Sequence, residues 1–333
     1  MTEMDPSELL KTAGRYRLSQ AIYAAASLGI ADELQGGERT AEELANAVGA
    51  HQPHLRRLLR ALSSEGVFRE TEDGRFGLTP AGELLVSGGG AREMVLGWSL
   101  LPASYAAFGM LADSVRLGQP AFELANGQDF HAYLAAHPDA ARAYDAATGS
   151  TVDAFDLAAT TYDFRGIKTV VDVGGGDGGF LVAILKQHAA MVGINFDLPD
   201  VIASIKEGSF PPGTSDRLQL VGGDFFKDQI PSGDAFVLST VLRLFEDDGA
   251  LIVLKNIRRA MQPESKVLVL DFVHPPGPLV APYGLADIHA MVVYGGRDRN
   301  EADFQRLFAA ADIRLTRVID TGELHSWVEG VRA

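Results

Sequence analysis

A run of glycines directly follows a short apolar segment near the middle of the chain. Residues 170–173 (VVDV) have the composition of a buried strand, and the run 174–179 (GGGDGG) follows without a break. Glycines at such a turn let the backbone bend sharply and let a ligand approach without a Cβ in the way. A helix is predicted to begin near Phe180. The run therefore lies at a strand-to-helix turn of the kind at which nucleotide-containing ligands bind.

The next predicted strand ends in a carboxylate that suits the same kind of ligand. Asp197 closes the segment 192–197 (VGINFD), 23 residues after Gly174. In nucleotide-binding folds, an acidic residue at about this separation accepts hydrogen bonds from the hydroxyls of a ribose. The spacing therefore favours Asp197 as a ribose ligand.

Three details distinguish this pattern from the glycine-rich turn of NAD-binding folds. The glycine spacing is G-G-G-x-G-G rather than G-x-G-x-x-G, and Asp197 is followed by Leu198 and Pro199. After the third predicted strand comes the segment 223–226 (GDFF). An aromatic ring there could stack on an adenine, and the carboxylate could accept a hydrogen bond from it.

These residues need a sheet to bring them together, and the second half of the chain predicts one. From Lys168 onward, strand-like segments alternate with helical ones. The strand-like segments are KTVVDVG, VGINFD, LQLVGGD, DAFVLST, KVLVLDFV, IRLTRVID and LHSWVEG. Such alternation is typical of a mostly parallel sheet with helices on both faces. The sequence therefore predicts an α/β fold with a Rossmann-like, seven-stranded sheet.

The first part of the chain predicts a separate helical module. Residues 8–35 are rich in Ala and Leu at helical spacing. Thr40 and Glu43 form a capping box that opens a short helix. A second helix is predicted within 51–68, and 68–79 reads as a hairpin that turns at an Asp-Gly pair. Two helices and a hairpin in this order are typical of a winged helix.

A winged helix can bind DNA, and three arginines bear on that possibility. Arg56, Arg57 and Arg60 are predicted to lie on the outer face of the second helix. The alternative is a solvated face of a dimerisation module. The net charge of −15, from 29 Lys and Arg against 44 Asp and Glu, favours the alternative. A nucleic-acid-binding protein gains affinity from cations placed against phosphates, so we expect no nucleic-acid partner.

The composition excludes several other kinds of site. The chain contains no cysteine, so disulfides, thiolate zinc sites and thiol nucleophiles are ruled out. The spacing of the histidines indicates no metal site. The first residues lack the apolar region of a signal peptide, and the apolar window 21–31 is too short to span a bilayer. We expect a cytoplasmic protein that needs no membrane and no metal.

Taken together, the motifs resemble those of the small-molecule O-methyltransferases of the caffeate and hydroxyindole type, which include many bacterial enzymes that tailor natural products. The resemblance covers nearly the whole chain. It rests on the winged-helix pattern, GQPAFELANGQDFHAYL at 118–134, VDVGGGDGGFL, DLPDVI, GGDFF and GGRDRNEADFQRLFAAA at 295–311. It implies a dimerisation domain in 1–95, a helical linker or substrate lid in 96–165, and a cofactor-binding Rossmann-like domain in 166–333. A homodimer through the first domain is implied as well.

The resemblance also implies the cofactor and the residues around it. The cofactor of the family is S-adenosylmethionine. By similarity, the residues that surround it here are Gly174, Gly176, Asp197, Leu198, Asp224, Phe225 and Ser239.

The family's catalytic pattern is altered in this chain. The family removes the proton of the methyl acceptor with a histidine in a motif of the form L-H-D-W-x-D-[DE], steadied by two glutamates. The matching stretch is 242–248 (LRLFEDD), which puts Arg243 at the position of the base. With a pKa of about 12.5 or more, a guanidinium cannot act as a general base near neutral pH. Asp271 and Asp298 replace the glutamates, each one methylene shorter.

Three interpretations of this centre remain open. Arg243 could pair with Asp271 and Asp298 in a dead site. Methylation could persist without a base, for an amine or an acidic acceptor, or for a phenol whose pKa the nearby cation lowers. Alternatively, the fold could catalyse a cyclisation, isomerisation or hydroxylation, with Arg243 as an electrophilic stabiliser. The favoured hypothesis is methylation of a small aromatic or polyketide-like metabolite.

Two histidines are candidates for a displaced base or a substrate contact. His289 and Met291 fall in a stretch that lines the substrate pocket of the family, and His131 lies in the segment DFHAY, which is also near the pocket by resemblance. A single histidine is more often a satisfied polar residue than a catalyst, so each stays a hypothesis.

Overall fold

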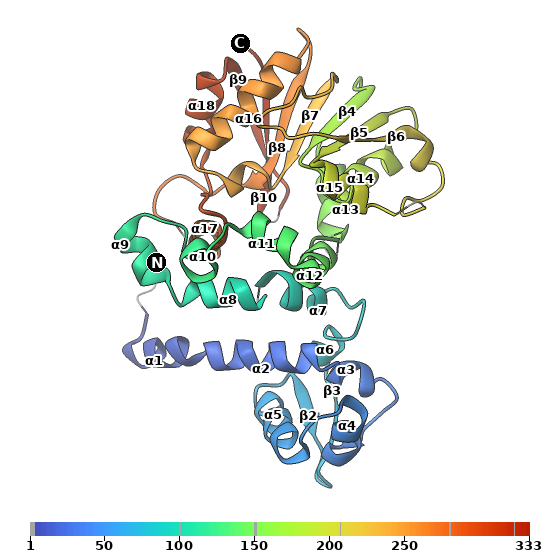
Figure 1. Cartoon of the computed structure of the whole chain (residues 1–333), viewed down its shortest axis with the longest axis vertical. Coiled ribbons are helices and arrows are strands. Elements are labelled where there is room, and N and C mark those ends of the chain that lie inside the picture. The colour runs from blue at the N-terminus through green and yellow to red at the C-terminus, as the bar shows by residue number, and fades with distance from the viewer. Residues whose placement is uncertain (1–3, 100, 150–151, 207, 280, 323) are drawn as a thin grey trace. The chain divides into compact units, whose positions relative to one another are not determined.

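The computed structural model describes residues 4–99, 101–149, 152–206, 208–279, 281–322 and 324–333. The chain divides into two compact units (Figure 1). The first unit comprises residues 1–109 and 131–151, and the second comprises residues 110–130 and 152–333.

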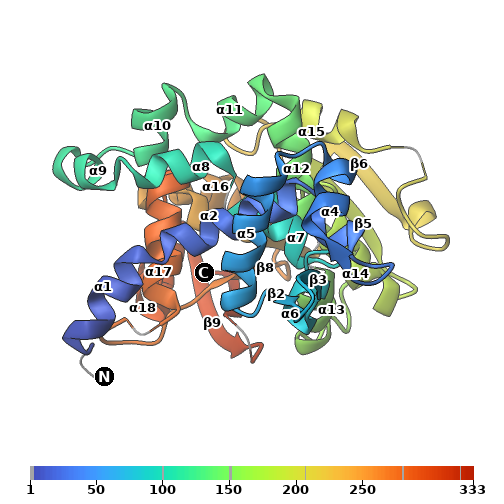
Figure 2. The same cartoon turned by 90° about the horizontal axis from the view of Figure 1, so that it is seen from below.

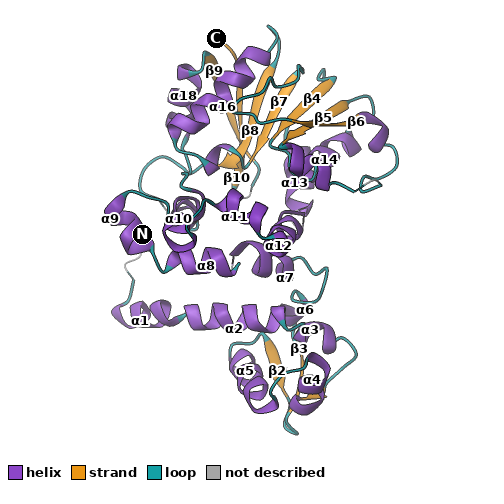
Figure 3. Ribbon diagram, viewed as in Figure 1, coloured by secondary structure: helices purple, strands orange, loops and turns teal. Residues whose placement is uncertain are grey.

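The second unit is built on a seven-stranded sheet with the strand order β6-β5-β4-β7-β8-β10-β9 (Figure 3). The strands are β4 (Thr169–Val173), β5 (Val192–Asp197), β6 (Leu218–Gly222), β7 (Ala235–Ser239), β8 (Lys266–Phe272), β9 (Ile313–Asp320) and β10 (His325–Arg332). Strands β4 to β8 are parallel, while β10 runs antiparallel to both of its neighbours. The predicted α/β class with a mostly parallel sheet is confirmed.

Helices cover both faces of this sheet because the buried strands are apolar on both sides. Val171 and Val173 of β4 pack with α16 (Asp247–Ala260) and α18 (Glu301–Ala310) on one face. Val170 packs on the other face with α13 (Val152–Thr161) and α14 (Gly179–Gln187). Near-continuous apolar runs are what a parallel sheet covered on both faces requires.

The parallel strands bring their carboxyl ends to one edge of the sheet. The glycine-rich run follows β4, Asp197 ends β5 and Ser239 ends β7. Asp271 is the penultimate residue of β8, and the first residue of β10, His325, pairs with Phe272 at the same edge. Ligands of open α/β sheets bind beyond this edge.

Shorter elements complete the second unit around the sheet. These are α9 (Leu111–Leu117), α10 (Ala121–Asn126), α15 (Pro199–Ser204), the 3₁₀ turns Ser215–Arg217 and Leu242–Leu244, α17 (Tyr283–His289) and the π-helix Ala290–Tyr294. A Cβ at Gly295 would lie 2.6 Å from Pro120, so only glycine lets the segment after the π-helix pass so close to the start of α10.

The first unit contains the predicted winged helix (Figure 2). Its elements are α1 (Pro6–Gly14), α2 (Tyr16–Ser27), α3 (Ile30–Glu33), β1 (Arg39–Thr40), α4 (Ala41–Val48), α5 (Gln52–Ser64), β2 (Phe68–Glu70), β3 (Arg75–Leu78) and α6 (Pro80–Glu83). Thr40 and Glu43 form the capping box that the sequence predicts. Leu55, Leu59 and Leu62 of α5 are buried in the core of this module.

Further helices follow the winged helix. They are α7 (Ala91–Met94), the π-helix Val95–Ser99, α8 (Pro102–Phe108), α11 (Phe130–Ala136) and α12 (Pro138–Gly149). A Cβ at Gly97 would collide with the backbone of Ala143, so a glycine is needed where the π-helix packs against α12.

Candidate active site

The glycine-rich run forms a tight loop above the end of β4. Gly174, Gly176 and Gly178 have φ angles of 77°, 57° and 83°, which residues with a Cβ rarely adopt. Gly175 has an ordinary φ, but a Cβ on it would lie 2.8 Å from the carboxylate of Asp172. The run is therefore required both for its backbone conformation and for the space that it leaves.

The Asp197 side chain is hydrogen-bonded to this loop. Its Oδ2 accepts a hydrogen bond from the backbone N–H of Gly176 at 2.7 Å, and its Oδ1 accepts one from the N–H of Leu198 at 2.6 Å. Each carboxylate oxygen can accept a second hydrogen bond. The side chain is thus held in a fixed orientation beside the glycine-rich loop.

Phe225 and Asp224 lie beside the loop. A Cβ on Gly174 would lie 3.4 Å from the Phe225 ring, and this ring packs against Phe226 with 4.9 Å between the ring centroids. Asp224 accepts hydrogen bonds from Lys227 Nζ at 2.7 Å and from the N–H of Phe226 at 2.8 Å. The bond from Lys227 is the main cause that lowers the pKa of Asp224, so the carboxylate is ionised at neutral pH.

Several buried oxygens near the loop lack hydrogen-bond partners among the described residues. They are both carboxylate oxygens of Asp172, the Oδ1 of Asn195 and the hydroxyl of Ser239. Buried polar atoms in a folded protein are normally satisfied, so a cluster of unsatisfied acceptors fits a ligand that carries positive charge and hydrogen-bond donors. The residues at this edge therefore fit S-adenosylmethionine, which has a sulfonium and an α-ammonium group.

Arg243 lies at the same edge in a buried ion-pair centre. Its Nε donates to Asp298 Oδ1 at 2.8 Å, and its Nη2 donates to Asp298 Oδ2 at 3.1 Å. Its backbone N–H donates to Asp271 Oδ2 at 3.1 Å, and Nε lies 3.7 Å from Asp271 Oδ1. The structure thus brings the three altered catalytic positions together. The arginine side chain is only 4% exposed, which makes it a fixed internal cation.

Arg243 also fixes a helix and lies over an aromatic ring. Its Nη2 donates to the backbone carbonyl of Ala286, in α17, at 3.1 Å, and its guanidinium carbon lies 4.3 Å from the centre of the Phe272 ring. A Cβ on Gly296 would collide with the backbone carbonyl of Arg243. The arginine therefore connects the turn after β7, the end of β8 and α17.

Burial sets the charges of this centre. Burial would lower the pKa of Arg243, but the hydrogen bonds and charges of Asp298, followed by the charge of Asp271, raise it above its ordinary value. Burial raises the pKa of Asp271 to about 7 despite the charge of Arg243, and it raises the pKa of Asp298 as well. Arg243 is consequently charged at every accessible pH and cannot take a proton from a methyl acceptor.

The charge of Arg243 affects the pKa values of two histidines. Burial, and then the charge of Arg243, lower the pKa values of His289 and His325 to about 4. The His325 ring also makes an edge-on contact with Phe272, with centroids 4.5 Å apart. Both imidazoles are therefore neutral at pH 7 but are weak proton acceptors.

The remaining sequence candidates fall in separate places. Met291 is half-buried in the π-helix that follows His289. His131 belongs to the first compact unit, on α11. The roles of these residues as substrate contacts stay predictions.

Sequence reasoning missed several residues at the site. Asp172 is the one charged residue in the buried strand β4, and a carboxylate among β-branched residues was an available signal. Arg299 is 1% exposed and donates to the carbonyls of Leu242 and Phe245 at 2.9 Å, which supports the turn that carries Arg243. The carbonyl of Ala286 could not have been found, because a backbone acceptor leaves no trace in the sequence.

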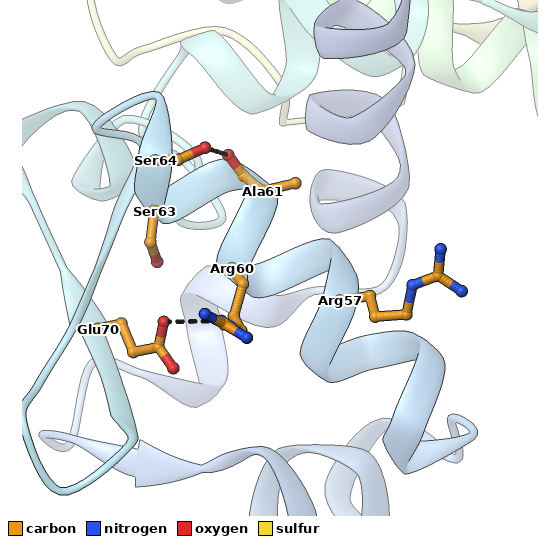
Figure 4. A pocket seen from close by; sticks show the side chains of 6 residues that line it. All are labelled: Arg57, Arg60, Ala61, Ser63, Ser64 and Glu70. Carbon is orange, nitrogen blue, oxygen red and sulfur yellow. Dashed lines mark hydrogen bonds and ion pairs between the residues drawn. The ribbon is translucent and has the colours of Figure 1, made fainter.

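The winged helix has a surface hollow of about 580 Å³, lined by Arg57, Arg60, Ala61, Ser63, Ser64 and Glu70 (Figure 4). Arg60 points toward the hairpin and pairs with Glu70, with 3.2 Å between Nε and Oε2. The positive charge of Arg60 is thus paired with a carboxylate that lines the same hollow.

Comparison with known proteins identifies the family. Residues 108–314 match the O-methyltransferase domain, and residues 10–88 match the O-methyltransferase dimerisation domain. The phenazine O-methyltransferase PhzM of Lysobacter antibioticus is 37% identical over 97% of this chain and 95% of its own length. The mitomycin biosynthesis 6-O-methyltransferase of Streptomyces lavendulae is 33% identical over 91% of this chain and 88% of its own length.

A solved relative shows the ligands of such a fold. The O-methyltransferase of neocarzinostatin biosynthesis was solved with S-adenosylmethionine and 2-hydroxy-5-methyl naphthoic acid. Its structure superimposes on the structure of this protein with a TM-score of 0.86. The two sequences are 30% identical, and the match covers 100% of each chain.

The chain belongs to the O-methyltransferase family, and it is a methyltransferase with a dimerisation domain at its start. The predicted family, enzyme class and cofactor type are thereby confirmed. In the part of the chain that the structure describes, no helix is long and apolar enough to cross a membrane.

Proposed function

We propose that this protein transfers the methyl group of S-adenosylmethionine to a hydroxyl group of a small aromatic or polyketide-like metabolite. The observation that carries the proposal is the assembly at the sheet edge, where Asp197 is fastened to the glycine-rich loop beside Phe225. Relatives that span nearly the whole chain include a phenazine O-methyltransferase and a mitomycin biosynthesis 6-O-methyltransferase. Their chemistry favours methylation over cyclisation, isomerisation or hydroxylation.

The cofactor would be held by residues of four strand ends. Gly174 and Gly176 leave room for the cofactor above β4, while the Asp197 carboxylate accepts hydrogen bonds from the hydroxyls of its ribose. Phe225 offers a ring face for the adenine, with Leu198 and Asp224 beside it, and Ser239 offers an unsatisfied hydroxyl. When bound, the cofactor supplies an electrophilic methyl group on a sulfonium, so the protein needs only to orient the acceptor and to provide for the loss of its proton.

Arg243 acts in this proposal by positioning. Its guanidinium donates hydrogen bonds to the Asp298 carboxylate and to the backbone carbonyl of Ala286. Because the guanidinium is already protonated, it does not accept a proton from the substrate. It sets the position of α17, and hence of the segment with His289 and Met291 that would line the acceptor site. The acceptor loses its proton without help from Arg243. This suits hydroxyl groups that are already acidic.

A homodimer is part of the proposal. The dimerisation-domain match begins within α1, and large apolar side chains near it are exposed. Leu9, Leu10 and Tyr16 are 59%, 79% and 57% exposed. An apolar helix surface of this kind is suited to burial against a second copy of the chain.

The test is incubation of the full-length protein with S-adenosylmethionine and a panel of hydroxylated aromatic compounds of graded acidity. The expected result is a product heavier by one methyl group together with S-adenosylhomocysteine, most rapidly with the acidic members. Conversion of a substrate with neither product appearing would contradict the proposal.

A further inference from the structure

Two buried polar side chains lie next to each other beneath the glycine-rich loop. Asp172 in β4 and Asn195 in β5 are register partners in adjacent parallel strands, and they are 1% and 0% exposed. A Cβ on Gly175 would collide with both side chains, so the tips of both lie close beneath the loop. Asn195 donates from Nδ2 to the carbonyl of Gly176 at 2.9 Å, which turns its Oδ1 toward Gly175.

All the unsatisfied atoms of this pair are hydrogen-bond acceptors. Both carboxylate oxygens of Asp172 and the Oδ1 of Asn195 have no partner among the described residues. Acceptors that face one another repel, and a buried carboxylate without a donor is a costly state. A single proton on Asp172 would remove both problems, because the carboxylic acid could then donate to Asn195 Oδ1.

The surroundings of Asp172 disfavour a negative charge. The neighbouring strand β7 pairs it with Val237, and the first turn of α14, which covers this face, brings Phe180. The charged groups that act on it are Asp197 at the end of β5 and Asp177 in the loop, both negative. Burial, followed by these two charges, raises the pKa of Asp172 to about 7.

We propose that Asp172 carries a proton in the free protein, shares it with Asn195, and releases it to solvent when the cationic amino-acid part of the cofactor binds above the loop. The inference rests on the proposed function, because it takes S-adenosylmethionine as the ligand. One O–H bond of Asp172 breaks, the proton passes to water or buffer, and the carboxylate that remains faces the positive ligand. Asp172 is thus a positioning residue that becomes fully ionised when the cofactor binds.

The consequence is a defined pH dependence of binding. Since the complex holds fewer protons than the free protein, affinity for the cofactor rises with pH through neutrality, up to the pH near 8 at which the α-amino group of the cofactor begins to lose its own proton. At pH 7 about half a proton is released per cofactor bound, and at pH 6 the amount is larger, provided that the bound carboxylate stays ionised.

Titration calorimetry in buffers of different ionisation enthalpy measures this release. The full-length protein is titrated with S-adenosylmethionine at pH 6, 7 and 8.5, and the dependence of the heat on the buffer gives the number of protons. We expect the release to fall as the pH rises. Adenosine, which lacks both positive charges, is expected to release none. A buffer-independent heat at all three pH values would overturn the inference, as would equal release with adenosine.

Two variants assign the proton. Asp172→Asn cannot ionise and is expected to bind the cofactor without the release seen in the wild type. Asp200→Asn makes the same change at an exposed acid on α15 and is expected to keep it. The α-amino group of the cofactor itself titrates near pH 8, but it is common to all three proteins, so the difference between them isolates Asp172. Undiminished release by Asp172→Asn would overturn the assignment.

The pH series on the wild type keeps the inference testable if Asp172→Asn does not fold. Failure of S-adenosylmethionine to bind at any pH would overturn the proposed function and this inference together. Binding without proton release would overturn only the inference.

Discussion

Arg243 and Asp298 form a two-bond ion pair in the interior of the protein, Nε to Oδ1 at 2.8 Å and Nη2 to Oδ2 at 3.1 Å, with neither side chain more than 4% exposed. Paired N–H groups and carboxylate oxygens fix orientation as well as distance. At the position where the resemblance predicts a proton acceptor, the chain has instead a rigid internal contact. Both the stability of the fold and the rate of methyl transfer should depend on that contact.

Asp298→Asn is expected to destabilise the protein by about 3–5 kcal/mol, because it leaves the buried charge of Arg243 without its main partner. Urea unfolding of the variant and the wild type measures the difference. The control is Asp163→Asn, which breaks the surface pair with Arg165 and is expected to leave stability almost unchanged. If the two substitutions lowered the free energy of unfolding equally, the buried pair would contribute no more to stability than the surface pair, which would contradict the prediction.

Arg243→Lys is expected to lower kcat about tenfold or more while leaving the dissociation constant of the cofactor within about twofold of the wild type. A lysine keeps the charge but cannot bond to Asp298 twice and also to the carbonyl of Ala286, so α17 loses its anchor. Steady-state kinetics and calorimetry separate the two quantities. A variant with wild-type kcat would rule out the positioning role, and strongly weakened cofactor binding would show that Arg243 acts on the cofactor rather than on the acceptor.

Gly175→Ala is expected to destabilise the protein by about 1–3 kcal/mol and to weaken cofactor binding at least about tenfold, because the added methyl group collides with Asp172 and Asn195. Thermal unfolding and calorimetry provide the two readouts. Gly36→Ala is the matched control, since a Cβ at that position would have nothing within 4 Å and its φ is ordinary. If Gly175→Ala binds the cofactor normally, the space beneath the loop is not needed.

The two histidines near Arg243 are expected to make the fold sensitive to acid. Their folded-state pKa values of about 4 lie below the ordinary value of 6.5, so the unfolded chain binds protons more readily. The stability that they contribute is complete above about pH 6.5 and is lost as the pH falls toward 4, by at most about 3 kcal/mol for each histidine. His325→Gln should therefore flatten this part of the unfolding profile, whereas His137→Gln, at an exposed position on the first unit, should not. Parallel profiles for all three proteins would contradict the shifted pKa of His325.

The sheet and the glycine-rich loop could be predicted from the sequence because their signals are local. A run of β-branched residues marks β4, the glycines follow at once, and Asp197 lies one strand further along the chain. The capping box of Thr40 and Glu43 is equally local, and the structure contains it. Each of these features depends on spacing that can be counted along the chain.

The centre around Arg243 could be predicted only in part. The resemblance placed Arg243, Asp271 and Asp298 in one site. It did not indicate that the Arg243 side chain is buried or that it donates to the carbonyl of Ala286. Burial depends on packing between segments far apart in the sequence, here residues 243, 271, 286 and 298. Asp172 was visible in the sequence as a carboxylate among β-branched residues, but its position beside Asn195 of the neighbouring strand was not.

The central claim is that this protein moves a methyl group from S-adenosylmethionine to an acceptor at the edge that contains the glycine-rich loop. The most direct measurement is a single-turnover reaction with cofactor whose methyl group is trideuterated, followed by mass spectrometry of both products. We predict that the intact deuterated methyl group appears on the acceptor in a one-to-one ratio with S-adenosylhomocysteine, and that Gly175→Ala loses this transfer. An acceptor that is converted without gaining deuterium, while the cofactor remains unchanged, would contradict the account.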